Sequence, residues 1–122
     1  MFTIHTLSLG EVEKIIRDIE AQALINGGHP IAIVVRGRDM AKIIACGGTS
    51  SKRSKERIEA IKASLDALKD GIDWSNSVIV MDHKNEIVGS IGVTGRDSVE
   101  NCNLARKGIE KFSYLYGTKD QD

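Results

Sequence analysis

The residues best suited to bind a ligand lie between a predicted strand and a predicted helix, in the segment from Cys46 to Lys55. A glycine pair, hydroxyl side chains and cations fill it, and its candidate binding residues are Gly47, Gly48, Thr49, Ser51, Arg53 and Lys55. The first N–H groups of a helix lack partners within the helix, and the helix dipole favours negative charge there. The segment therefore predicts a carboxylate or phosphate site, with a solvated loop as the alternative. Its spacing is not that of a Walker A motif.

A second glycine-rich segment precedes the last predicted helix. Its candidate binding residues are Gly92, Gly95 and Arg96. Successive backbone N–H groups beside an arginine form a nest that can hold an anion. Alternatively, the glycines allow close packing of strand on helix, or a subunit contact. If both segments meet in space, they form one pocket.

His29 is the candidate haem or metal ligand, because it stands between a glycine-rich helix end and Pro30. The alternative is a histidine that only hydrogen-bonds at the end of an element. His5 and His83 stand alone, and no HxxxH or HExxH spacing occurs, so no structural metal site is predicted. Without a GxSxG elbow or an evident carboxylate pair, the residues favour a binding protein over an enzyme.

Composition indicates one domain, spanning residues 1–122. Seventeen basic and seventeen acidic residues cancel, so no nucleic-acid or membrane partner is expected from charge. No apolar run is long enough to span a bilayer, and the first residues do not read as a signal peptide. Cys46 and Cys102 form no CxxC pair and are predicted to be reduced and buried. We therefore expect a cytoplasmic protein.

Three helices are predicted from apolar periodicity and capping signals. The first begins after a capping box of Ser8 and Glu11 and ends at Asn26-Gly27-Gly28. The second spans about 51–70, and the third follows Asp97. Their predicted buried faces are Val12, Ile15, Ile16, Ile19, Ala23 and Leu24; then Ile58, Ile61, Leu65 and Leu68; then Cys102, Ala105, Ile109, Phe112 and Tyr116.

Four strands are predicted at 31–35, 40–46, 76–81 and 87–94, with an additional edge strand at 2–6. The first two form a hairpin through Arg36-Gly37-Arg38-Asp39, and the last two form another. The strand at 31–35 is too apolar for a sheet that is exposed to solvent on one face. The expected fold is an α/β (α+β) three-layer, profilin-like domain. In it an antiparallel sheet of four to five strands has helices on both faces.

With these elements placed, three segments resemble the GlcG/HbpS family, often labelled haem-degrading, which includes the C-terminal domain of PduO-type proteins. The segments are Leu7-Ser8-Leu9 with the later Gly28-His29-Pro30, then Lys62-Ala63, then Val88-Gly89-Ser90-Ile91-Gly92-Val93-Thr94-Gly95 with Ala105-Arg106-Lys107-Gly108. The loop after the middle helix is shorter than is usual in that family, so the chain looks like a shortened member.

The resemblance implies a homo-oligomer that binds a small molecule, either haem or a small carboxylate, and His29 is the candidate for a haem ligand on the grounds given above. Two alternatives remain open. One is a weak enzyme acting on haem or an organic acid, and the other is an oligomeric scaffold or ligand-sensing module without catalysis.

Overall fold

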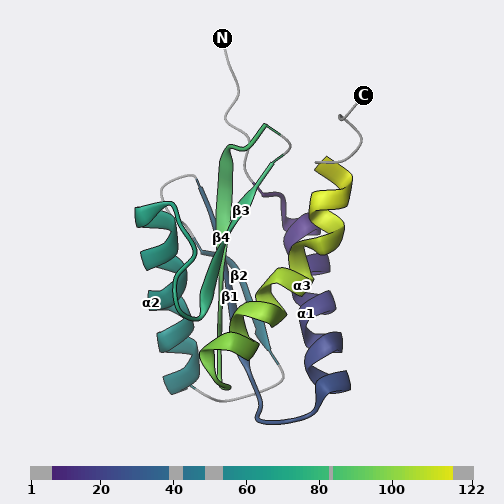
Figure 1. The fold of residues 1–122 in the computed structure, drawn as a ribbon, viewed down its shortest axis with the longest axis vertical. Coiled ribbons are helices and arrows are strands. Elements are labelled where there is room, and N and C mark those ends of the chain that lie inside the picture. The colour runs from purple at the N-terminus through teal and green to yellow at the C-terminus, as the bar shows by residue number, and fades with distance from the viewer. Residues whose placement is uncertain (1–6, 39–42, 49–53, 83, 117–122) are drawn as a thin grey trace.

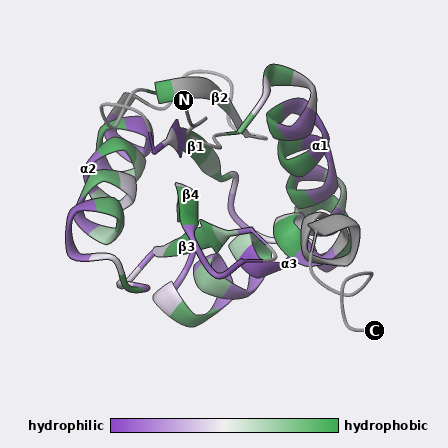
Figure 2. Cartoon of the chain, turned by 90° about the horizontal axis from the view of Figure 1, so that it is seen from above, coloured by the Kyte–Doolittle hydropathy of each residue, from purple (hydrophilic) through white to green (hydrophobic). Residues whose placement is uncertain are grey.

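The structure, a computed structural model, describes residues 7–38, 43–48, 54–82 and 84–116. In chain order its elements are α1 (Leu9–Asn26), β1 (Ala32–Gly37), β2 (Ile43–Gly48), α2 (Ser54–Asp70), β3 (Ser77–Met81), β4 (Ile87–Thr94) and α3 (Ser98–Tyr116). The strands form one antiparallel sheet in the order β2-β1-β4-β3. Helix α2 covers one face, and α1 and α3 cover the other (Figures 1 and 2). The predicted three-layer fold is confirmed, and the expected edge strand at 2–6 lies outside the described residues.

Helix α1 begins and ends where its capping signals predict. The Ser8 side chain accepts a hydrogen bond from the N–H of Glu11, whose carboxylate accepts one from the N–H of Ser8. At the other end Gly27 has a φ of 71° and donates its N–H to the carbonyl of Ala23. The predicted buried face is correct except for Leu24, which is 72% exposed and lies on the same side of α1 as the exposed Arg17 and the partly buried Glu20.

The sheet places two sequence-distant strands at its centre. β1 pairs with β2 through a local connection and with β4 across more than fifty residues, and every residue of β1 is buried. The prediction that Arg36 begins a turn is wrong, because β1 continues to Gly37. The Arg36 guanidinium instead lies beneath α2, where it donates to Ser64 Oγ at 2.9 Å and to the Ile61 carbonyl at 3.0 Å.

Helix α2 packs chiefly through small residues, and of its predicted apolar stripe Ile61, Leu65 and Leu68 are only partly buried. Ala60, Ser64 and Ala67 are buried, whereas Ile58 is 64% exposed. The reason lies in the sheet, since a Cβ on Gly92 would stand 2.3 Å from the carbonyl oxygen of Ala60. Only small side chains fit where the two backbones approach so closely.

Helix α3 completes the second helical layer. Asp97 caps it as predicted, since its Oδ1 accepts the N–H of Glu100 at 2.9 Å. Leu104 and Ala105 join the core between α1, α3 and the sheet, while Cys102 and Ile109 are only partly buried. The side chains of the predicted Phe112 and Tyr116 lie outside the described residues. Cys46, predicted to be buried, is exposed because β2 is an edge strand and α2 lies mainly over β1, β4 and β3.

Candidate functional site

Both predicted binding segments lie at the same end of the sheet. Ala32, the first residue of β1, pairs with Gly48 of β2 on one side and with Thr94 of β4 on the other. Thr94 Oγ1 donates to the carbonyl of Glu56, which brings the first turn of α2 to this end. The connection from the end of α1 to the start of β1 lies at this end as well (Figure 1). We call this region, comprising residues 24–31, 47–48, 55–56 and 94–97, the glycine end of the sheet.

In the first predicted segment, both glycines contact α1 or β1 closely. A Cβ on Gly47 would lie 2.5 Å from Ile16 Cγ2, and Gly48 donates its N–H to Glu20 Oε2 at 2.9 Å. Lys55 is exposed at the start of α2. Thr49, Ser51 and Arg53 lie outside the described residues. The carboxylate of Glu20 therefore already occupies one donor of this segment, and an added anion would be held chiefly by the α2 start and its cations.

The second predicted segment is tied to α1. The Arg96 side chain is 6% exposed and donates from Nη2 to the Ala23 carbonyl at 3.2 Å and from Nε to the His29 carbonyl at 2.7 Å. Its Nη1 pairs with Glu100 Oε2 at 2.7 Å. Gly95, with a φ of 122°, lies directly against the Pro30 carbonyl. The contacts of Arg96 thus hold the end of α1 against the start of α3, and ligand binding by this segment stays a prediction.

His29 presents its imidazole to solvent from an anchored backbone. Its carbonyl is fixed by Arg96 Nε, whereas its ring hydrogen-bonds to no other residue in the described part of the chain. The neighbouring α1 residues Leu24 and Ile25 are 72% and 76% exposed. An exposed imidazole that follows two exposed apolar side chains in the chain stays a candidate donor for a metal-centred ligand.

One polar atom at the glycine end is buried without a partner. Glu56 Oε1, in the first turn of α2, is buried and accepts no hydrogen bond from the described residues. Leaving a buried acceptor unpaired costs about 1–3 kcal/mol. A ligand group or water molecule that donates a hydrogen bond would remove this cost, which marks the start of α2 as receptive to a polar group.

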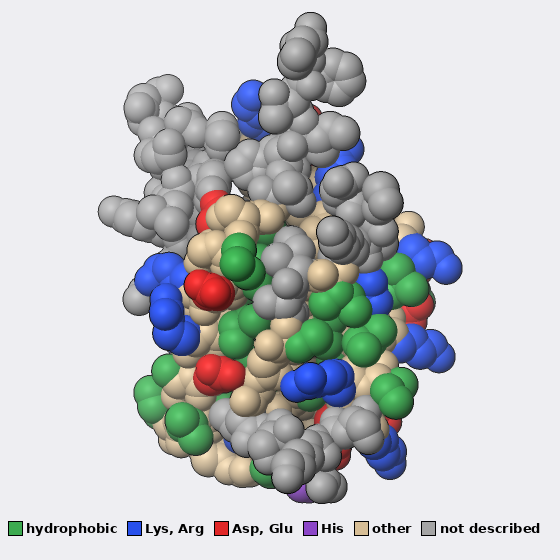
Figure 3. Space-filling model, turned by 180° about the vertical axis from the view of Figure 1, so that it is seen from behind, with side chains coloured by type: hydrophobic (Ala, Val, Ile, Leu, Met, Phe, Trp, Pro, Cys, Tyr) green, Lys and Arg blue, Asp and Glu red, His purple; other side chains and the backbone are tan. Residues whose placement is uncertain are grey.

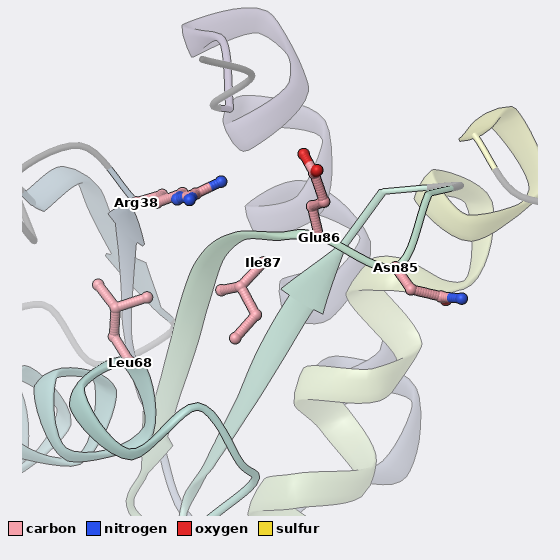
Figure 4. Close-up of a pocket in the computed structure, with 5 residues that line it drawn as sticks. All are labelled: Arg38, Leu68, Asn85, Glu86 and Ile87. Atoms are coloured by element: carbon pink, nitrogen blue, oxygen red, sulfur yellow. The ribbon is translucent and has the colours of Figure 1, made fainter.

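The hollows lined by described residues were not predicted from the sequence, and the first of them lies away from the glycine end. One of about 400 Å³ is lined by Arg38, Leu68, Asn85, Glu86 and Ile87 at the opposite end of the sheet (Figure 4). Another of about 240 Å³ lies between α1 and α3 and reaches Ile25 of the glycine end. No sequence motif marks the first hollow, because β1–β4 pairing alone brings Arg38 beside the β4 residues.

The buried Arg36 side chain places a charge on the α2 side of the sheet. Burial lowers the pKa of Arg36 below its ordinary value, and the nearby Cys46 side chain partly offsets this effect.

Within the described ranges, no group of three or more His, Cys, Asp or Glu side chains could hold a metal ion. Nor is any helix in these ranges long and apolar enough to cross a membrane.

The chain shares its fold with solved proteins of low sequence identity. It is similar to HbpS, with a TM-score of 0.74, 17% identity and coverage of 97% of this chain and 95% of that one. Protein ORFY from Klebsiella pneumoniae gives a TM-score of 0.81 at 12% identity, covering 93% and 94%. PduOC, solved as a haem complex, gives 0.73 at 10% identity, covering 86% and 94%.

The structural likeness confirms the predicted resemblance to GlcG/HbpS-type proteins at the level of the fold. No protein-family model matches the chain, and no curated protein matches it in sequence. A shared fold alone does not show that two proteins bind the same ligand.

Proposed function

We propose that the chain is a small-molecule-binding protein whose ligand is haem, held at the glycine end of the sheet. The observation that carries the proposal is His29, whose ring has no hydrogen-bonding partner among the described residues and whose anchored backbone follows the exposed Leu24 and Ile25 in the chain. The fold is also that of PduOC, which was solved with haem bound. These two facts are independent, because one comes from this chain's own residues and the other from the whole fold.

The residues present fit the needs of haem. A porphyrin requires an axial donor, apolar surface for its ring and cations for its propionates. His29 supplies the donor, Leu24 and Ile25 supply apolar surface, and Lys55 supplies positive charge at the start of α2. Bound haem would add an iron centre able to take an exogenous ligand. The contribution of this chain is to bind and orient the group.

A haemin titration followed in the Soret region tests the proposal. We expect the wild-type protein to give a saturable, stoichiometric band. The His29→Ala variant should shift or lose this band, since the axial donor is removed. His83→Ala is the matched control and should titrate like the wild type. An unchanged band in His29→Ala would exclude His29 as the ligand. A featureless wild-type titration would overturn the haem proposal and direct attention to small anions.

We also propose that the protein is a homo-oligomer. Seen from behind, the molecule shows apolar side chains gathered over its middle between charges of both signs (Figure 3). Elsewhere on the surface, Ile58, Trp74 and Val99 are also large exposed apolar side chains. Apolar surface of this kind is commonly covered by a partner. Light scattering should give a mass that is a multiple of the mass of one chain, and the mass of a single chain would contradict the proposal.

A further inference from the structure

The hollow at the end of the sheet opposite the glycine end has walls of opposite charge. Arg38 follows β1, and Glu86 precedes β4. In Figure 4 the side chains of Arg38 and Glu86 stand at the rim, and the side chain of Asn85 points away from the opening. Within the described part of the chain, neither Arg38 nor Glu86 has an ion-pair or hydrogen-bonding partner for its side chain. A guanidinium and a carboxylate that share a hollow without pairing are both available to a ligand.

The backbones that carry these two charges are fixed. The Arg38 N–H donates to the Val88 carbonyl at 3.0 Å, which extends the β1–β4 pairing by one residue. The Glu86 N–H donates to Oδ1 of the buried Asp82 at 3.0 Å, and the Glu86 carbonyl accepts from the Asp82 N–H at 3.0 Å. Lys84 donates its N–H to the same Asp82 oxygen. Both charged side chains are therefore attached to rigid backbone, which lowers the entropy cost of binding a ligand.

The floor of the hollow is apolar and well supported. Leu68 from the last turns of α2 and Ile87 from the start of β4 form it. Both side chains are only partly buried, so each leaves apolar surface for a ligand. Gly71 ends α2 beneath this floor, where an added Cβ would contact Ile87 Cδ1 at 3.4 Å. The volume of about 400 Å³ lies within the range of small-molecule sites.

We propose that this hollow binds a zwitterionic α-amino acid with an apolar side chain. Its carboxylate would pair with Arg38, its ammonium group with Glu86, and its side chain would lie on Leu68 and Ile87. Charge-assisted hydrogen bonds of this kind are about twice as strong as neutral ones. A simple carboxylate gains the Arg38 contact but meets the negative charge of Glu86, and a simple amine meets the reverse mismatch. The site therefore selects the zwitterion, and it is independent of the haem proposal at the other end.

Calorimetric titration with L-leucine tests this inference. We expect saturable binding to the wild type, with 4-methylpentanoate and isopentylamine at least tenfold weaker because each lacks one charged group. Arg38→Gln and Glu86→Gln should each weaken L-leucine binding at least tenfold. Arg17→Gln and Glu13→Gln, on the exposed side of α1, are the matched controls and should bind as the wild type does.

Three outcomes would overturn the assignment. They are the absence of saturable L-leucine binding to the wild type, equal binding of either single-charge analogue, and unchanged L-leucine binding by both hollow variants. Because the analogue comparison uses the wild-type protein, it decides the question even if a substitution disturbs folding. Haemin binding does not enter any of these measurements.

Discussion

Replacing Gly92 by alanine is expected to lower the free energy of unfolding by about 3 kcal/mol. The added Cβ would stand 2.3 Å from the Ala60 carbonyl oxygen and 3.1 Å from the Ser64 nitrogen. Both are backbone atoms of a helix, so neither can move without shifting α2 away from β4. Such a shift would also strain the bonds that Ser90 Oγ donates to the Ser64 carbonyl and Thr94 Oγ1 donates to the Glu56 carbonyl.

Urea unfolding measures this effect, and Gly10→Ala is its control. A Cβ on Gly10, in the first turn of α1, meets nothing within 4 Å. Gly10→Ala should therefore be neutral or stabilise the protein by up to about 1 kcal/mol, as glycine-to-alanine changes in helices do. If Gly92→Ala unfolds at the same urea concentration as the wild type, the close packing of α2 on β4 is incorrect.

Replacing Arg96 by methionine is expected to cost about 3 kcal/mol of stability. The change keeps much of the side-chain volume but removes the donor that Arg96 supplies to the His29 carbonyl, and it leaves the Ala23 carbonyl with the Gly27 N–H alone. It also removes the partner of Glu100, whose side chain is 33% exposed and so can recover part of its hydration. The end of α1 would then lose its tie to the start of α3.

Arg106→Met is the matched control for this prediction. The Arg106 side chain is 53% exposed and lies 3.6 Å from Asp73 Oδ2, an ion pair of the kind that contributes about 0–1 kcal/mol. Thermal unfolding should separate the two variants clearly. Equal melting temperatures for Arg96→Met and Arg106→Met would show that the contacts of Arg96 with α1 do not stabilise the fold.

Local signals in the sequence predicted the elements well because the causes are local. The Ser8–Glu11 capping box, the Gly27 helix end and the Asp97 cap each depend on a few neighbouring residues, and all three are present. The 87–94 strand is confirmed with the same bounds. Capping and strand patterns need no knowledge of what packs against them.

The packing of α2 could not be predicted in this way. Its apolar stripe contains Ile58 and Leu65, and periodicity favours burial of such a stripe. The sheet beneath instead presents Gly92, Ser90 and Thr94, which match the small residues Ala60 and Ser64. Which face of a helix is buried depends on the surface it meets, and that surface comes from β4, about thirty residues further along the chain.

The candidate sites show the same limit. Convergence of the two glycine-rich segments depends on Ala32 pairing with both Gly48 and Thr94, which follows from the strand order and not from any motif. Arg38 and Glu86 line one hollow for the same reason, because the strand order brings the end of β1 beside the start of β4. The sequence identified residues with suitable chemistry, whereas the topology decides which of them can act together.

Chemical-shift mapping of ¹⁵N-labelled protein with gallium protoporphyrin IX, a diamagnetic haem analogue, tests the central proposal most directly. We expect saturable shifts at the amides of Gly28, Gly48 and Gly95, which lie at the glycine end. Gly71 and Gly89, at the opposite end of the sheet, should remain unchanged. Shifts centred on Gly71 and Gly89, or no saturable shift at any amide, would contradict haem binding at the glycine end.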